Sequence, residues 1–593
     1  MASFQQFGEV SDRRRADLDL RRRRKIRIGG TAAAIVLLLA VAGTACTLYS
    51  PDKEAATQNR ASTGGKAVDT LRTTSKSVEA LCDSTDYKQT CVSSLNRVVK
   101  TNTKDPKDLI QAAVSVVLEE MNTALNRTRL LADKDPKVRG AFEDCLQLLD
   151  DSKDEIKRSL DSIMANGLDK LPQKSREIRA WLSSVMSYQQ TCIDGFPEGE
   201  TKSKLQKLLN TAKELTSNSL AIIGDLSSFL ESLDVPGFSG PSRKLLDTEV
   251  NAEGFPSWLP EENRRVLKQV SIKLKPNVVV AKDGSGDFRT ISEALAKIPT
   301  KREGRYVIYV KAGVYDETVN VTKKMVDVTM YGDGSTKTIV TGNKNFVDGV
   351  RTFLTATFAV TGDNFMGINM GIRNTAGAIK HQAVALRVQS DRSIFFNCRF
   401  EGYQDTLYAQ AKRQFYRSCV ISGTVDFIFG DSAAIFQNCL ILIRRPLDNQ
   451  QNIVLAHGRV DRHETTGFVL HKCRIAADGH LEPLQGKLRS YLGRPWKEYA
   501  RHVIMETEIS GAIHPDGYMP WEGDFGLKTL FYGEFNNTGP GAGFAGRVKW
   551  PGVKLLKKTT VQRYTVASFI QGNEWINSMT PSVTIPVRYG LYY

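Results

Sequence analysis

The chain has 593 residues, of which 41% are hydrophobic and 25% charged, a composition typical of a globular protein rather than a disordered or fibrous one. A single core seldom extends over so many residues, so we expect two or more domains. The formal net charge of +16 suits a polyanionic partner, but no zinc-finger spacing or RNA-binding signature accompanies it, and nucleic acid is therefore not favoured.

The chain begins with a basic leader, residues 1–27, followed by an uncharged stretch, residues 28–51, whose centre is almost wholly apolar. This order predicts a signal-anchor with a cytosolic N-terminus, or a cleaved signal peptide, and so an association with the membrane before processing. Everything downstream is then expected in the oxidising secretory pathway, where disulfides form. Asn126, Asn320 and Asn536 begin Asn-x-Ser/Thr sequons and are candidate glycosylation sites.

Residues 66–233 contain little glycine or proline, and apolar residues recur there at helical spacing. Short connections between these stripes predict an antiparallel four-helix bundle with no catalytic constellation of its own. The stripes are Ile110, Val114, Val117 and Met121; Phe142, Cys145, Leu146 and Leu149; Ile178, Trp181, Leu182, Val185 and Cys192; and Leu205, Leu208, Leu209 and Ala212.

Four cysteines lie in this helical region, and four cysteines allow three pairings. The arrangement resembles that of the plant invertase and pectin methylesterase inhibitor family. That resemblance implies the disulfides Cys82–Cys91 and Cys145–Cys192.

Residues 234–276 are rich in Pro, Gly and Ser and form a predicted linker. It contains the run Arg243, Lys244, Leu245 and Leu246. A basic pair in an exposed linker is a candidate processing site, with an uncut linker as the less favoured alternative.

From residue 277 to 593 the sequence consists of short β-rich runs separated by Gly, Asn and Asp. An aromatic-polar-cysteine run recurs and ends at Cys398, Cys419, Cys439 and Cys473. A period near 20 residues without helical stretches predicts a parallel β-helix, with a sandwich or barrel as the alternative. Cysteines at equivalent positions of neighbouring coils would be close enough to bond, so either Cys398–Cys419 or Cys419–Cys439 could form.

The same register predicts a pair of carboxylates. Asp405 follows Cys398 by seven residues, and Asp426 follows Cys419 by seven. On adjacent coils the two side chains would repel, so that one is ionised and the other protonated, as nucleophile-plus-acid chemistry requires. The alternative is that each aspartate only caps a turn.

Other hydrolase signatures are absent from the sequence. It contains no Gly-x-Ser-x-Gly elbow, and the run that starts at His463 and Glu464 does not continue to a second zinc-binding histidine. The seven histidines form no ligand cluster, so neither a metal nor a cofactor is expected.

Six segments in order across residues 277–590 resemble the successive signatures of plant pectin methylesterases. They are 280–288 (VAKDGSGDF), 331–338 (YGDGSTKT), 381–386 (HQAVAL), 402–408 (GYQDTLY), 423–430 (GTVDFIFG) and 492–496 (LGRPW). With the inhibitor-like region, the resemblance implies a right-handed parallel β-helix catalytic domain behind an all-α four-helix-bundle pro-domain.

This resemblance also implies residue roles. Asp426 would be the nucleophile and Asp405 the proton donor and base, with Gln382 and Gln404 stabilising the oxyanion. Arg494 would keep Asp426 ionised. The substrate would contact Gln382, Arg494 and three aromatic residues, Tyr408, Phe429 and Trp496. One disulfide, Cys419–Cys439, is implied as well.

The implied activity is hydrolysis of pectin methyl esters, releasing methanol in the extracellular cell wall. A subtilisin-like protease would cut at 243–246, and the pro-region could inhibit its own or other pectinesterase domains, or aid folding or export. A β-helix polygalacturonase or lyase, and a wall-binding protein without activity, are the competing interpretations.

Three details of the sequence bear on how well it matches the pattern of the family. Gln404 and Asp405 are adjacent and cannot both face a cleft unless the chain bends between them. Ala378 replaces a common Pro, which we expect to be harmless. Tyr518 stands where a cleft Trp is common, with Trp521 nearby, which puts substrate fit in question.

Overall fold

The computed structural model describes residues 77–99, 105–132, 138–228, 274–579, 583 and 585–592. The basic leader, the predicted membrane segment 28–51 and the predicted processing run 243–246 lie outside these residues. Within the described ranges, no helix is both long enough and apolar enough to cross a membrane.

The first described region is helical, as predicted. Its helices are α3 (Lys88–Val98), α4 (Pro106–Ala132), α5 (Arg139–Ala165), α6 (Leu171–Asp194) and α7 (Glu200–Gly224). Helices α4 to α7 pack as a four-helix bundle, in which α5 contacts α4 and α6, and α7 contacts α4 and α6. The predicted stripes supply the core: Ile110, Val114 and Val117 of α4 are fully buried, together with Leu182 and Val185 of α6.

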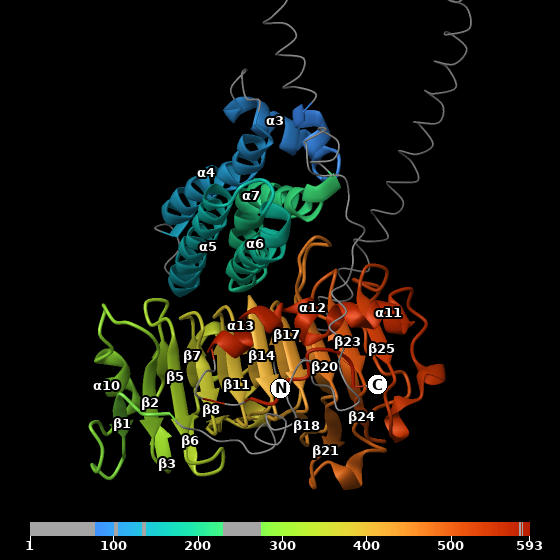
Figure 1. The fold of residues 1–593 in the computed structure, drawn as a ribbon. Coiled ribbons are helices and arrows are strands. Elements are labelled where there is room, and N and C mark those ends of the chain that lie inside the picture. The colour runs from blue at the N-terminus through green and yellow to red at the C-terminus, as the bar shows by residue number, and fades with distance from the viewer. Residues whose placement is uncertain are drawn as a thin grey trace, which may run out of the picture. The chain divides into compact units, whose positions relative to one another are not determined.

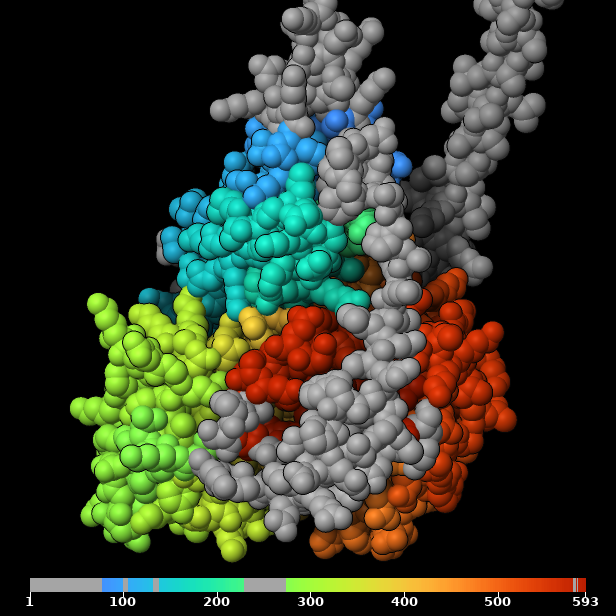
Figure 2. Space-filling model, in the orientation of Figure 1, coloured from blue at the N-terminus to red at the C-terminus, as the bar shows by residue number. Residues whose placement is uncertain are grey.

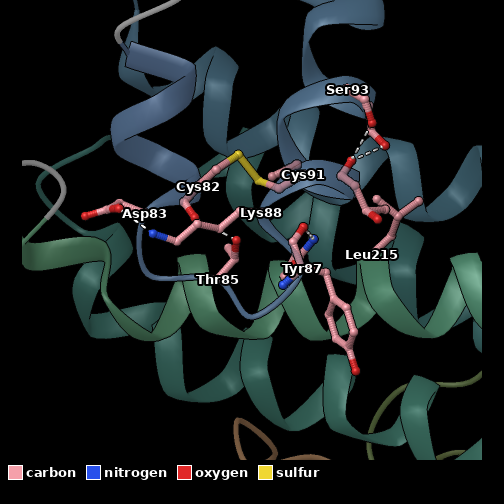
Figure 3. Close-up of a disulfide and its surroundings, with 12 residues drawn as sticks. Cys82, Asp83, Thr85, Tyr87, Lys88, Cys91, Ser93 and Leu215 are labelled. Carbon is pink, nitrogen blue, oxygen red and sulfur yellow. Dashed lines mark hydrogen bonds and ion pairs between the residues drawn. A yellow bond between two sulfur atoms is a disulfide. The ribbon is translucent and has the colours of Figure 1, made fainter. Parts of the chain in front are cut away.

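Two disulfides in this region are those predicted from the resemblance. Cys82 and Cys91 are joined across the turn that leads into α3, with Cα atoms 5.8 Å apart (Figure 3). Cys145 of α5 is joined to Cys192 of α6. The first bond lies beside an ion pair between Lys88 and Asp83, 2.7 Å long and also drawn in Figure 3.

The second region is a parallel β-helix, as predicted, and its described strands form three sheets. Every strand pair in them is parallel, and successive strands of one sheet come from successive coils, so the coils stack in chain order (Figures 1 and 2).

The first sheet contains β1 (Val278–Val280), β2 (Tyr306–Val310), β5 (Val328–Gly332), β8 (Met366–Ile368), β11 (Ser393–Phe396), β14 (Arg413–Arg417), β17 (Ala433–Gln437), β20 (Gly467–His471), β23 (Arg501–Met505), β25 (Phe531–Phe535) and β26 (Val553–Leu555). The second contains β4 (Val319–Val321), β7 (Phe358–Val360), β10 (Leu386–Val388), β13 (Leu407–Ala409), β16 (Ile428–Gly430), β19 (Asn452–His457) and β22 (Ser490–Pro495). The third contains β3 (Gly313–Asp316), β6 (Thr338–Gly342), β9 (Gly371–Asn374), β12 (Arg399–Glu401), β15 (Val420–Gly423), β18 (Leu440–Ile443), β21 (Arg474–Ala477) and β24 (Glu508–Ile509).

Short helices accompany the coils: α10 (Ile291–Ala296) follows β1, and α11 (Lys558–Val561), α12 (Val566–Phe569) and α13 (Gly572–Met579) follow β26. Helix α10 begins at a capping box, in which Thr290 and Glu293 each accept a hydrogen bond from the other's backbone N–H. Trp575 and Ile576 of α13 are buried in an apolar cluster with Phe415 and Ile435 of the first sheet, so α13 covers part of the outer face of that sheet.

The repeated aromatic-polar-cysteine run predicted the register correctly. Phe395, Tyr416 and Phe436 are paired in register on β11, β14 and β17, and their rings stack with centroids 5.2 and 4.7 Å apart. The residue before each cysteine turns the chain in the left-handed backbone region, at Asn397, Ser418, Asn438 and Lys472. The recurrence of this turn keeps the cysteines at equivalent positions of the coils.

The predicted disulfide Cys419–Cys439 is wrong for this structure, because both residues are free, buried thiols, as are Cys398 and Cys473. Side chains at equivalent positions of adjacent coils point the same way, so their Cβ atoms stay about 4.8 Å apart, the strand spacing. A disulfide favours Cβ atoms about 3.5–4.5 Å apart. The thiols instead contact backbone carbonyl oxygens, such as Cys473 with Phe436, 3.1 Å away.

Candidate active site

The two predicted aspartates occupy equivalent positions on adjacent coils. Leu407 of β13 pairs with Ile428 of β16, and each aspartate precedes its strand by the same number of residues. The N–H of Asp405 donates to the carbonyl of Val425, 3.0 Å away, which joins the two turns directly. Both carboxyl side chains are buried, with Asp405 8% and Asp426 6% exposed. The cysteine register therefore located the carboxylate pair correctly.

A bend separates Gln404 from Asp405, as the alternation of side chains required. Asp405 has a φ of 62° and Asp426 a φ of 49°, so both residues adopt the left-handed conformation, which is uncommon outside glycine but tolerated by Asp. Tyr403 and Asp405 are joined by an isolated β-bridge, which marks a tight local turn. The same conformation recurs at the turns of other coils, so it positions the two acids without marking them as functional.

Arg494 holds Asp426 in a bidentate ion pair. Its Nε donates to Oδ1 at 2.8 Å and its Nη2 to Oδ2 at 2.5 Å. The guanidinium also lies over the ring of Trp521, 4.3 Å from the centroid. Such a fork of charge-assisted hydrogen bonds fixes the orientation of the Asp426 side chain.

Asp405 has the opposite electrostatic character. Burial, and then the charge of Asp426, raise the pKa of Asp405 well above 3.8, while Arg494 opposes this only in part. The two acids thus differ in their surroundings: Asp426 is paired with an arginine, and Asp405 has a raised pKa. This difference is the one that nucleophile-plus-acid chemistry needs.

Two glutamines accompany the acids. The carbonyl of Gln404 accepts from the N–H of Ala383, 3.2 Å away, which brings the turn containing Gln382 next to the turn containing Asp405. The side-chain Oε1 of Gln404 is buried and has no hydrogen-bond partner in the described structure.

The second sheet carries a row of side chains in register, which we call the outer row: Ala359, Arg387, Tyr408, Phe429, Ala456 and Arg494. Its neighbours along the strands, such as Leu386 and Val388, are buried in the main core, so the outer row faces away from it. The rings of Tyr408 and Phe429 stack 4.3 Å apart, and Trp496 packs edge-on against Phe429 at 5.9 Å. The three predicted aromatic residues therefore form one continuous surface.

Helix α6 contacts this aromatic surface. The helical region and the β-helix belong to one compact unit, residues 68–593. The hydroxyl groups of Thr191 and Tyr408 are 3.3 Å apart, and Lys497 forms a 2.8 Å ion pair with Asp194. Residues near the C-terminal end of α6 thus lie against the predicted substrate surface.

Three residues of this site were missed from the sequence or weighed wrongly. Tyr518 does not line a cleft: it is 1% exposed and its hydroxyl lies 3.2 Å from Glu534. Trp521, which stacks on Arg494, supplies the aromatic ring there. Arg387 was overlooked, although its spacing of 21 residues from Tyr408, equal to that between Tyr408 and Phe429, was visible in the sequence.

No metal centre is evident in the described part of the chain, which contains no group of three or more His, Cys, Asp or Glu side chains arranged to hold an ion. The buried histidines instead contact aromatic rings and an acid. His457 and His502 lie beside Phe468, and His471 lies 2.9 Å from Glu506.

Comparisons with known proteins agree with this geometry. Residues 277–573 match the pectinesterase family, and residues 76–222 match the plant invertase/pectin methylesterase inhibitor family. The chain is 44% identical to the putative pectinesterase/pectinesterase inhibitor 45 of Arabidopsis thaliana over the whole of both chains. It is 50% identical to the probable pectinesterase/pectinesterase inhibitor 13 of the same plant, over 87% of this chain and 82% of that one.

Among solved structures, the pectin methylesterase from carrot is 50% identical, with a TM-score of 0.53, and the match covers 54% of this chain and all of that one. The chain therefore belongs to the pectinesterase family, as a plant-type enzyme with an N-terminal inhibitor-like domain.

Proposed function

We propose that the Asp405–Asp426 pair hydrolyses the methyl esters of pectin through a covalent acyl-enzyme. The observation that carries this proposal is the contrast between the two acids: Asp426 is bound by Arg494, and Asp405, one coil away, has a raised pKa. A nucleophile and a proton donor are thereby provided by two residues of the same type.

In the first step an oxygen of Asp426 attacks the ester carbonyl carbon, and the side-chain amides of Gln382 and Gln404 donate hydrogen bonds to the resulting oxyanion. The bond to the methoxy group then breaks, and Asp405 gives its proton to the leaving oxygen, so methanol departs. An anhydride joins Asp426 to the galacturonate unit.

In the second step Asp405, now ionised, accepts a proton from water as the water oxygen attacks the acyl carbon. The bond to Asp426 breaks, which restores its carboxylate and leaves Asp405 protonated. The galacturonate product ionises in solution. Tyr408, Phe429 and Trp496 support the sugar rings.

The rest of the chain fits a secreted precursor. A signal-anchor or signal peptide at 28–51 would direct the protein to the secretory pathway and the cell wall. Cleavage at 243–246 by a subtilisin-like protease would release the catalytic domain. The contacts of α6 with Tyr408 and Lys497 favour a pro-region that restricts substrate access until then. Asn126, Asn320 and Asn536 are exposed, as glycosylation requires.

The test is methanol release from highly methylated pectin by residues 247–593 and by the full chain, each compared with Asp426→Ala. We expect activity that is lost in the variant, without the fall in viscosity that chain cleavage causes. Release that survives Asp426→Ala would refute the mechanism, and a folded wild-type domain that releases no methanol would favour a binding protein.

A further inference from the structure

A second pair of acids, Asp431 and Glu464, is buried close to the aromatic surface. Asp431 follows Phe429 by two residues, in the turn between β16 and β17, and Glu464 lies in the loop 458–466 between β19 and β20. Their exposed fractions are 4% and 1%. Neither acid takes part in the two catalytic steps proposed above.

The hydrogen bonds of this pair require one proton between the two carboxyl groups. Oδ1 of Asp431 accepts from the hydroxyl of Thr466 at 2.6 Å. Oε1 of Glu464 accepts from the backbone N–H groups of Val460 and Asp461 at 3.1 and 2.8 Å. The other two oxygens are buried, and no donor among the described residues reaches them. The two side chains are hydrogen-bonded to each other, and because a carboxylate can only accept, one of the two acids keeps its proton.

The electrostatic surroundings agree with a shared proton. Burial raises the pKa of Asp431 to about 6 and the pKa of Glu464 well above 4.5. The titratable groups that face the pair are Arg459 and Asp461 of the same loop, His457 of β19, Arg501 of β23 and Lys213 of α7. Of these, His457 is kept neutral because burial lowers its pKa well below 6.5. Since both folded pKa values are raised, the proton is held at low pH and is lost as the pH rises through them.

The loop 458–466 lies against the ring of Trp496. A Cβ atom at Gly458 would be 2.8 Å from that ring, so the absence of a side chain there lets Trp496 approach the loop backbone. The N–H of Gly458 donates to the carbonyl of Gly430 at 2.7 Å, directly after Phe429. Because Trp496 packs edge-on against Phe429, the loop supports the contact between two aromatic residues of the predicted substrate surface.

Glu464 fixes the shape of this loop and, through Arg459, the segment that follows Trp496. The carbonyl of Glu464 accepts from Nε of Arg459 at 3.1 Å. Arg459 binds both backbone groups of Tyr499: its carbonyl accepts the N–H at 3.0 Å, and its Nη1 donates to the carbonyl at 3.3 Å. Tyr499 follows Trp496 by three residues and Arg494 by five. A change at Glu464 therefore acts on the substrate surface through backbone contacts.

We infer that Glu464 is a positioning residue of the esterase site, and that the proton it shares with Asp431 keeps the loop 458–466 in the form that supports Trp496. When this proton is lost at higher pH, two buried carboxylates repel each other and the loop loosens. The sugar ring on Trp496 is then held less firmly, while bond formation at Asp426 is unaffected. This inference rests on the proposed function, because Trp496 is assigned to the substrate there.

The experiment measures KM and kcat for methanol release from highly methylated pectin at pH 5 and pH 8, with the full-length protein and with residues 247–593. Glu464→Gln should keep the wild-type KM at pH 5, because its amide donates to Asp431 and its oxygen still accepts from the loop. At pH 8 the wild-type KM should exceed that of Glu464→Gln by about three- to tenfold. Asp405 is unchanged in both proteins, so its own titration cancels.

Two further variants make the comparison specific. Glu498→Gln makes the same chemical change at an exposed residue of the Trp496 segment and should follow the wild type at both pH values. Glu464→Met cannot bind the loop N–H groups and should raise KM about three- to tenfold at both pH values, with kcat within about twofold of the wild type.

The inference is overturned if the KM of Glu464→Gln rises with pH as that of the wild type does, or if Glu464→Met, folded by circular dichroism, keeps the wild-type KM. The pH dependence of Glu464→Gln decides the matter should Glu464→Met fail to fold.

Urea unfolding of the full-length protein, which requires no turnover, tests the shared proton separately. The wild type should lose stability relative to Glu464→Gln between pH 5 and pH 8, and equal losses would reject the shared proton. The predicted KM difference, with methanol release that survives Asp426→Ala, would retain the positioning role and reject the esterase mechanism. Release lost in Asp426→Ala, with identical KM profiles in wild type and Glu464→Gln, would do the reverse.

Discussion

Two positions of the outer row, Arg494 and Arg387, carry the same residue type in opposite electrostatic settings. At one end Arg494 is paired with Asp426 through two hydrogen bonds and covered by Trp521. Further along the row Arg387 is covered by Phe353, and it donates hydrogen bonds to the neutral amide oxygens of Gln389 and Gln410. Burial lowers the pKa of Arg387 to about 10, whereas the pKa of Arg494 is raised because Asp426 and its hydrogen bonds outweigh burial.

The comparison separates two uses of a buried arginine. The guanidinium of Arg494 orients a carboxylate, whereas that of Arg387 is held by neutral amide oxygens. Both guanidinium groups lie beside an aromatic ring. The two sites therefore differ in the presence of a paired acid and not in their aromatic packing. The following substitutions test whether that difference has the consequences we assign to it.

The largest effect is expected at the paired end. Arg494→Met leaves Asp426 buried without its partner, so the unfolding free energy should fall by about 3–5 kcal/mol and kcat by about a thousandfold. The matched change Arg387→Met removes a charge that has no partner and should leave the unfolding free energy unchanged or raise it. Urea unfolding and methanol release measure both. Equal destabilisation of the two variants would remove the distinction between them.

A smaller effect on kcat is expected at Gln404, an uncharged residue next to Asp405. Gln404→Leu should lower kcat by about a hundredfold, because one oxyanion donor is lost. Thermal stability should hold, since Oε1 of Gln404 is buried without a partner and its removal leaves no donor unsatisfied. A loss of stability with unchanged kcat would assign Gln404 to the fold instead of the chemistry.

The smallest effect concerns the proton on Asp405. Because the pKa of Asp405 is raised on folding, its contribution to stability is fully present below about pH 4 and is lost as the pH rises through the raised pKa. Asp405→Asn should therefore gain unfolding free energy relative to the wild type between pH 4 and pH 8. Unfolding curves at both pH values provide the measurement, with the exposed Asp316→Asn as control. A parallel pH dependence in wild type and Asp405→Asn would show that Asp405 titrates normally.

The sequence predicted the paired end of the site well because the repeat carries the information. A recurring aromatic-polar-cysteine run sets the register of the coils, and register alone places Asp405 beside Asp426. The bend at Asp405 was required by side-chain alternation, but its left-handed form depends on contacts between turns that no local pattern encodes. The burial of Tyr518 against Glu534 and the substitution of Trp521 for it likewise depend on tertiary packing.

Arg387 was missed, and the thiols were paired wrongly, for related reasons. Arg387 lies in a three-residue strand between Leu386 and Val388. A single charged residue between two apolar residues of a strand is usually interpreted as facing solvent. Whether Arg387 has an ion-pair partner depends on the residues that surround it in the folded chain, which the local sequence does not specify. For Cys419 and Cys439, the sequence spacing correctly predicted that the two residues lie close together. Their side chains point in the same direction from stacked coils, however, and do not form a disulfide.

The central claim is that Asp426 forms the bond to the substrate. The most direct test is intact-protein mass spectrometry of residues 247–593, quenched within milliseconds of mixing with fully methylated trigalacturonate. The account predicts a transient mass increase equal to the substrate minus methanol, located on the peptide that contains Asp426 and absent from Asp426→Ala. Full methanol release without any adduct at the shortest times, or an adduct located on Asp405, would contradict it.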